Sequence, residues 1–209
     1  MNERMRTDYS YNLHLLSQVE IDDSPLNMPI IKAIDTYPPE IIGFNYARTT
    51  SNFRKGVHFY LDDYQFSRCW KEPERYAEML RKFDYVFTPD FSLYTDMPKP
   101  LQIYNVYRSR LLGAFWQERG INVIPTLSWS DEDSFEFCFN GVEPGGVVTV
   151  STVGVIKNVE SLKFWKKGMV EMIKRIKPST ILIYGKPIEF DNEDSEVFYF
   201  KNTNLGRLG

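Results

Sequence analysis

The sequence has few of the residues that most metal sites and nucleophilic sites require. Its 209 residues include two cysteines and two histidines, too few for a zinc site, an iron–sulfur cluster or the histidine-rich centre of a metallohydrolase, zinc deaminase or relaxase. Cys69 and Cys138 lie in separate segments, which predicts two buried thiols in a reducing compartment. His58 lies within an apolar run, where a packed core histidine is expected. The functions left after these exclusions are carboxylate-based catalysis and simple ligand binding.

A strong charge bias and long apolar runs are also lacking. The formal net charge is −3, so a nucleic-acid partner would need a local basic patch. No window approaches the roughly 20 apolar residues of a membrane-spanning helix, and the N-terminus has no apolar core typical of a signal peptide. We therefore expect a cytoplasmic protein with no membrane partner.

Short apolar segments alternate with amphipathic ones along the chain. Runs rich in β-branched and aromatic residues predict strands at 40–47, 57–63, 85–92, 122–129, 146–154, 180–185 and 197–202. Apolar residues at three- and four-residue spacing predict helices at 72–83, 102–120 and 160–177. This alternation is typical of an α/β protein with a mainly parallel sheet and flanking helices, either an open sheet or a partial (β/α) barrel.

The chain is predicted to form one domain. With 43% hydrophobic and 15% aromatic residues, it can bury one substantial core. Residues 1–39, which include DDSPLNMPI and TYPPE, are expected to form an irregular N-terminal arm, and residues 40–209 a single α/β domain. The acidic segment EFDNEDSE is expected to be a solvated loop before the last strand.

Polar side chains collect at the expected carboxyl ends of the strands. In parallel sheets these ends and the loops that follow them form the ligand crevice. The candidate ligand-binding residues at this edge are Asn45, Arg48, Ser92, Trp129, Ser130, Ser151 and Thr152. Arg108, in the predicted helix 102–120, could reach an anionic ligand, although an exposed helix arginine is the more common case.

Three aspartates are the candidate catalytic residues. Asp62 and Asp63 stand where the second strand ends, in VHFYLDDYQF, and Asp90 in FTPDFS repeats the arrangement one strand later. Since consecutive strand residues point to opposite faces, one of the pair is expected to point into the crevice and the other to cap the next helix or turn. A pair of Asp62 or Asp63 with Asp90 could share acid and base roles or hold Mg²⁺, with Asp62 and Asp90 as the metal ligands. A solvated loop at 62–63 and an Asx-turn or helix N-cap at Asp90 stay open as purely structural interpretations.

Four motifs in a fixed order resemble a known protein family. They are HFYLDDYQFSRCW, FTPDFSLYTDMP, QIYNVYRSRLLGAFWQERGINVIPTLSW and VSTVG, and the similarity covers roughly residues 30 to 186. The sequence resembles an uncharacterised family of bacterial, phage and mobile-element proteins, domain of unknown function 4417. The resemblance implies a phage, prophage or conjugative-element setting and brings no established activity with it.

Three functions fit these residues. The first is a carboxylate- or Mg-dependent enzyme, hydrolase- or nuclease-like, that acts on a nucleotide or another phosphorylated ligand. The second is a non-catalytic protein that sequesters such a ligand, and the third is a protein that engages a host or replication protein. A close carboxylate pair with a raised pKa would favour the first, a closed dry pocket the second, and a large exposed apolar patch the third.

Overall fold

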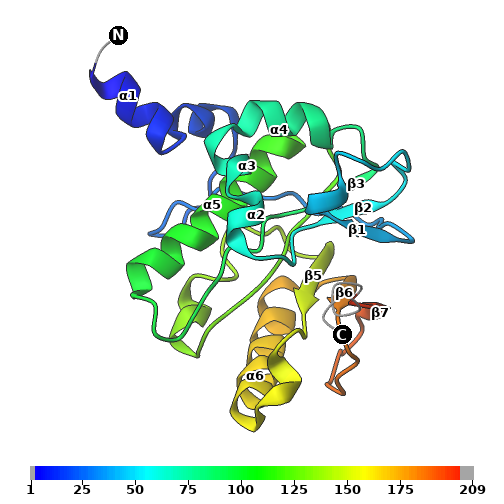
Figure 1. Ribbon diagram of the computed structural model, residues 1–209. Coiled ribbons are helices and arrows are strands. Elements are labelled where there is room, and N and C mark those ends of the chain that lie inside the picture. Colours follow the sequence, from blue (N-terminus) through cyan, green and yellow to red (C-terminus); the bar gives the residue numbers. More distant parts are fainter. Residues whose placement is uncertain (1–2, 203–209) are drawn as a thin grey trace.

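The computed structural model describes residues 3–202 and contains two parallel β-sheets flanked by helices (Figure 1). The first sheet has the order β1 (Ile41–Gly43), β2 (Gly56–His58), β3 (Tyr85–Phe87) and β4 (Val123–Ile124). The second has the order β5 (Val147–Ser151), β6 (Thr180–Tyr184) and β7 (Glu196–Phe200). Every ladder within the two sheets is parallel. The predicted α/β class with mainly parallel pairing is confirmed.

The helices lie against the outer faces of these sheets. The three predicted helices are present as α4 (Pro73–Leu80), α5 (Lys99–Gln117) and α6 (Val159–Ile176). Two short helices, α2 (Asp63–Phe66) and α3 (Arg68–Lys71), follow β2, and short 3-10 turns occur at Phe44–Tyr46, Asp133–Glu136 and Val155–Lys157. The N-terminal arm contains α1 (Glu3–Ser10) and a 3-10 helix at Leu13–Gln18. In the described residues, no helix is long and apolar enough to cross a membrane.

The strands of the first sheet are much shorter than the apolar runs that predicted them. The run at 40–47 pairs only over Ile41–Gly43, because Phe44 begins a 3-10 turn. Phe44, Phe59 and Phe91 lie beyond the paired residues and are nevertheless buried. Apolar patterning reports burial, and these rings enter the core without joining a ladder. The predicted strands were therefore too long, although their positions along the chain were right.

A backbone bridge joins the two sheets. Thr126 and Thr149 form an isolated parallel bridge, in which the Leu127 N–H donates to the Thr149 carbonyl (2.8 Å) and the Thr149 N–H to the Pro125 carbonyl (3.0 Å). Thr126 follows β4 and Thr149 lies in β5, so the spatial order of the strands follows their order in the sequence across both sheets. Among the described residues no ladder joins β7 to β1, and the arrangement is open.

Side chains fill the space between the two sheets and the faces behind them. Alternate strand residues point to opposite sides. The inner cluster therefore takes residues from both sheets: Tyr60, Phe87, Ile124, Val147, Leu182 and Tyr184. A second core packs α4 and α5 against the first sheet, and a third packs α6 against the second sheet. Both faces of each sheet are thus covered, as parallel sheets require.

Arg110 on α5 is a buried cation that stabilises the junction between the sheets. Its side chain is only 2% exposed, and its guanidinium donates to the carbonyls of Thr126 (3.2 Å), Cys138 (2.7 Å) and Asn140 (2.9 Å). Burial lowers the pKa of Arg110 to about 10, so the group stays charged at neutral pH. Charge-assisted hydrogen bonds therefore hold α5 to the segment that carries Thr126 and leads into β5.

We expect Arg110→Met to lower the free energy of unfolding by about 3 kcal/mol or more, because three buried carbonyls lose their donor. Urea denaturation followed by circular dichroism measures this change. Arg81→Met is the matched control, since the Arg81 side chain is 57% exposed and pairs only with Glu78 on its own helix face. Its effect should stay below about 0.5 kcal/mol. Equal effects of the two substitutions would contradict the role assigned to Arg110.

Candidate functional site

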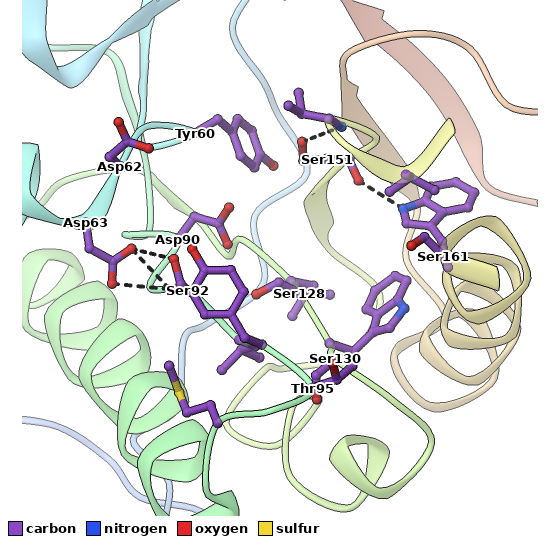
Figure 2. Close-up of a pocket in the computed structure, with 18 of the residues that line it drawn as sticks. Tyr60, Asp62, Asp63, Asp90, Ser92, Thr95, Ser128, Ser130, Ser151 and Ser161 are labelled. Atoms are coloured by element: carbon purple, nitrogen blue, oxygen red, sulfur yellow. Dashed lines mark hydrogen bonds between the residues drawn. The ribbon is translucent and has the colours of Figure 1, made fainter. Parts of the chain in front are cut away.

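A large crevice opens at the carboxyl ends of the strands and is shared by the two sheets (Figure 2). Its volume is about 1640 Å³, which exceeds the roughly 300–1,000 Å³ of common small-molecule pockets. The segments that follow β2, β3, β4 and β5 form its walls together with the first turns of α6. This is the edge at which ligands bind in parallel α/β folds.

Most of the residues predicted from the sequence line this crevice. They are Asn45, Asp62, Asp63, Asp90, Ser92, Trp129, Ser130 and Ser151. They come from strand ends that are far apart in the sequence, and the parallel pairing of the strands brings these ends to one edge. The crevice also contains residues that the sequence did not single out, among them Tyr60 and Ser128.

Three predicted ligand-binding residues do not line the crevice. Arg48 is exposed on the loop after the first 3-10 turn of the domain. The Arg108 guanidinium lies 3.8 Å from the centre of the Phe91 ring and donates to Asn105 Oδ1 (2.5 Å). Thr152 is buried, and its hydroxyl donates to the Lys186 carbonyl (2.8 Å). Arg108 thus packs against a ring and Thr152 ties two loops together, while Arg48 stays exposed.

Asp62 and Asp63 have different surroundings. Asp62 is exposed at the N-cap position of α2 and makes no capping hydrogen bond. Asp63 is half-buried and accepts from both the backbone N–H (3.2 Å) and the hydroxyl (2.8 Å) of Ser92. The Asp63 carboxylate therefore ties the start of α2 to the loop after β3 and stands beside Asp90 (Figure 2). Both aspartates line the crevice, and neither side chain caps the helix.

Asp90 lies between Asp63, Tyr60 and Ser128 (Figure 2). Part of its carboxyl group opens into the crevice while protein atoms surround the rest. Burial, opposed by a hydrogen bond with Ser128 and reinforced by the Asp63 charge, raises the pKa of Asp90 from 3.8 to about 7. At neutral pH the carboxyl is thus shared between its protonated and ionised forms, which suits proton transfer.

Tyr60 connects the first sheet to the second beside Asp90. Its ring stacks on Tyr184 with a centroid distance of 4.7 Å, and its hydroxyl lies 2.7 Å from Thr149 Oγ1. Because the Thr149 hydroxyl donates to the Leu182 carbonyl (3.0 Å), Tyr60 is the donor in its bond with Thr149. Burial, with the Asp90 charge, raises the pKa of Tyr60 well above its usual value. The phenol stays neutral, and its oxygen can accept a hydrogen bond.

His58 lies behind Tyr60 and belongs to the core, as predicted. It accepts from the Tyr60 backbone N–H (3.3 Å), and its ring lies 4.7 Å from that of Tyr184. Burial lowers the pKa of His58 to about 3, so the imidazole is neutral at physiological pH. The histidine supports Tyr60 and takes no direct part in the crevice.

Helix α6 positions the aromatic wall of the crevice. The Trp129 indole N–H donates to the Phe164 carbonyl (3.3 Å), and the Trp165 indole N–H donates to the Ser151 carbonyl (2.9 Å). Trp129 lies directly on Gly168, where a Cβ atom would stand 2.1 Å from Trp129 Cε2. The absence of a side chain at Gly168 is thus what lets Trp129 approach the helix.

The crevice is lined by acidic residues and by no basic ones. Its carboxyl groups are those of Asp62, Asp63, Asp90, Asp96, Asp131 and Glu160, and none of its described lining residues is Lys, Arg or His. Asp96 and Glu160 were missed in the sequence because neither stands at the end of a predicted strand. Over residues 3–202 no group of three or more His, Cys, Asp or Glu side chains could hold a metal ion. A magnesium ion held by Asp62 and Asp90 stays a prediction.

The fold and the crevice define an α/β protein with parallel strands and an acidic crevice at their carboxyl ends. A family model, the domain of unknown function DUF4417, matches residues 20–201. The chain belongs to this family, which confirms the resemblance seen in its motifs.

Two curated phage proteins are similar to the chain. The Gene 1 protein of Mycobacterium phage L5 is 38% identical over 174 residues, which cover 82% of this chain and 76% of that protein. The Gene 1 protein of Mycobacterium phage D29 is 41% identical over 130 residues, which cover 62% of this chain and about half (48%) of that protein. No solved structure matches. The chain is thus a phage-associated protein.

The raised pKa of Asp90 predicts that Asp90→Asn stabilises the fold at high pH. The native state holds the Asp90 proton more tightly than the unfolded chain, so stability falls as pH rises from about 4 to about 7. Asn removes this cost, which is at most about 4 kcal/mol and less where crevice water screens the carboxylate. Urea denaturation at pH 8 should show Asp90→Asn as more stable than the wild type, and the difference should vanish below pH 4. Asp62→Asn is the control, and an Asp90→Asn protein less stable than the wild type at pH 8 would contradict the prediction.

The contact between Trp129 and Gly168 predicts that Gly168→Ala destabilises the protein. Alanine gains about 1 kcal/mol of helix propensity over glycine, but overpacking against the indole costs about 1–3 kcal/mol. We expect a net loss of stability and a shift in tryptophan emission. The double variant Gly168→Ala, Trp129→Leu should recover the propensity gain, which a double-mutant cycle measures. Additive effects would show that the two residues do not press on each other.

Proposed function

We propose that the protein is an enzyme that binds a small ligand in the crevice and uses Asp90 to transfer protons. The observation that carries this proposal is the placement of Asp90, a partly buried carboxyl group beside Asp63 and Tyr60 in a crevice at the carboxyl ends of the strands. Catalytic carboxyl groups with a pKa near neutrality arise from this combination of burial and a neighbouring like charge.

The neighbouring residues have distinct roles in this proposal. Ser92 fixes the Asp63 carboxylate through two hydrogen bonds, so its charge stays beside Asp90. The Ser128 side chain bonds the Asp90 carboxyl group and orients it. Ionised Asp90 can remove a proton from an attacking group such as water, and protonated Asp90 can return a proton to a leaving group. Hydrolases and group-transfer enzymes use these two proton transfers.

The make-up of the crevice walls makes a nucleotide a candidate ligand. The carboxyl groups of Asp62, Asp63 and Asp90 come from the segments after β2 and β3, and the indoles of Trp129 and Trp165 come from the segment after β4 and from α6. A base could stack on the indoles. Phosphate groups next to carboxylates need a cation between them, so a nucleotide would enter with Mg²⁺ held by Asp62 and Asp90. The protein would bind such a ligand without turnover if no proton transfer followed.

Thermal unfolding against a panel of nucleotides with Mg²⁺, phosphorylated metabolites and amines tests the proposal. A ligand at about 100 times its Kd adds about 2.7 kcal/mol to the stability of the native state, and each kcal/mol raises the Tm of a domain of this size by about 2–4 °C. We expect a ligand that raises the Tm of the wild type and leaves that of Asp90→Asn unchanged.

Asp84→Asn is the matched control, because Asp84 is exposed at the amino end of the same strand, β3. It should respond to the ligand as the wild type does. Product formation, followed by NMR with the ligand that passes this test, separates an enzyme from a binding protein. If every ligand that stabilises the wild type stabilises Asp90→Asn equally, the crevice assignment is wrong.

A further inference from the structure

We propose that the crevice binds an organic cation, a ligand that carries a primary amine or a guanidinium group. The proposal rests on the proposed function, because it names the ligand class of the same crevice. It is carried by the sign of the charges along the walls, by the hydrogen-bond acceptors around Asp90, and by the aromatic rings that face them.

The lining of the crevice has one sign of charge. Six acidic side chains lie along it and no basic side chain does, within the part of the chain that the structure describes. Asp62, Asp63 and Asp90 come from the segments after two adjacent strands, β2 and β3, whereas Asp131 comes from the segment after β4 and Glu160 from the first turn of α6. Walls of low dielectric constant focus the field of these carboxylates into the crevice. Such a field attracts a cation and repels a free phosphate.

Three basic residues near the crevice bond other groups. Arg108 interacts electrostatically with Asp63, but its guanidinium donates to Asn105 and packs on Phe91. Lys99 pairs with Glu136 (2.6 Å), and Lys167 pairs with Glu132. Neither of these glutamates lines the crevice. Arg108 acts electrostatically on Asp63 and Lys99 on Asp131, but none of these three cations lines the crevice or bonds one of its carboxylates.

Two groups beside Asp90 offer acceptors. Asp63 has its carboxylate held in place by Ser92. The Tyr60 hydroxyl donates its proton to Thr149, so its oxygen offers lone pairs to a ligand. An ammonium group carries three donors and a guanidinium group five, with no acceptor. A ligand of this kind matches the carboxylates and the phenol oxygen, whereas a free phosphate would be repelled by the carboxylates.

Aromatic rings stand close to these acceptors. The crevice is lined by Tyr60, Tyr64, Tyr94, Trp129, Phe164, Trp165 and Tyr184. The face of an aromatic ring attracts a cation, and Trp is the strongest of the three ring types. Carboxylates combined with indoles are therefore suited to hold a charged group and the apolar chain that bears it. The volume of about 1640 Å³ leaves room for an elongated polyamine or for the side chain of a basic peptide.

Isothermal titration calorimetry with cadaverine and with pentanediol, its uncharged counterpart, tests the proposal directly. Spermidine and agmatine extend the series of free cations, a blocked lysine peptide represents a protein-borne one, and inorganic phosphate is the anion. At pH 8 we expect the cations to bind, and pentanediol and phosphate not to bind. Asp90→Asn should weaken cation binding by about tenfold or more, the worth of one charged hydrogen bond, while Asp84→Asn leaves it unchanged.

The series of ligands also separates free cations from a protein-borne one. Binding of the free cations alone, or of the peptide alone, supports the proposal and identifies the source of the charged group.

Three outcomes would each contradict the cationic ligand. They are pentanediol binding as well as cadaverine, phosphate binding without Mg²⁺, and a failure of all the cations to bind. The proposed function is judged separately. If the cations fail but an Mg²⁺-nucleotide stabilises the wild type and not Asp90→Asn, the proposed function stands and only the ligand class is wrong. If cations bind the wild type and Asp90→Asn equally, the role of Asp90 in both proposals is wrong.

Discussion

The pairing of Thr126 with Thr149 is the interaction on which the rest of the structure depends. It is the bridge that turns two separate parallel sheets into one run of strands in sequence order. Arg110 stabilises it by bonding the Thr126 carbonyl and two carbonyls of the segment that leads to β5. With the sheets joined there, Tyr60 from the first can stack on Tyr184 of the second. The crevice is the space that this junction leaves open at the carboxyl ends.

The same geometry places the Asp90 carboxyl group where its ionised form destabilises the fold. Asp90 is desolvated on one side and faces the Asp63 charge, and both effects disfavour its ionised form. Binding sites commonly carry such destabilising arrangements, and the cores elsewhere in the fold offset them. Here three apolar clusters cover both faces of the two sheets. A cation in the crevice would relieve the repulsion, which connects ligand binding to the electrostatics of the empty site.

Much of the fold could be predicted from local patterns, and part of the site could not. The helices α4, α5 and α6 were recognisable because helical periodicity repeats over many residues. The ends of the short strands were not, because Phe44 and Phe59 are buried without pairing. Tyr60 was not predicted as a site residue because it lies in an apolar run, where a core residue is expected. Arg108 was expected to reach a ligand, yet it packs on Phe91, a contact between distant segments.

By itself, the sequence determined the class of fold, the family, and the fact that aspartates stand at the ends of β2 and β3. These are local properties, set by periodicity and by short motifs. Only the tertiary structure decided which carboxyl groups face each other, that Asp90 titrates near neutrality, and that the crevice is lined by acids without bases. The physical reason is that a pKa and an electrostatic field depend on burial and on distances across the fold. Asp62 and Glu160 are far apart in the sequence and line the same crevice, which their spacing in the sequence does not predict.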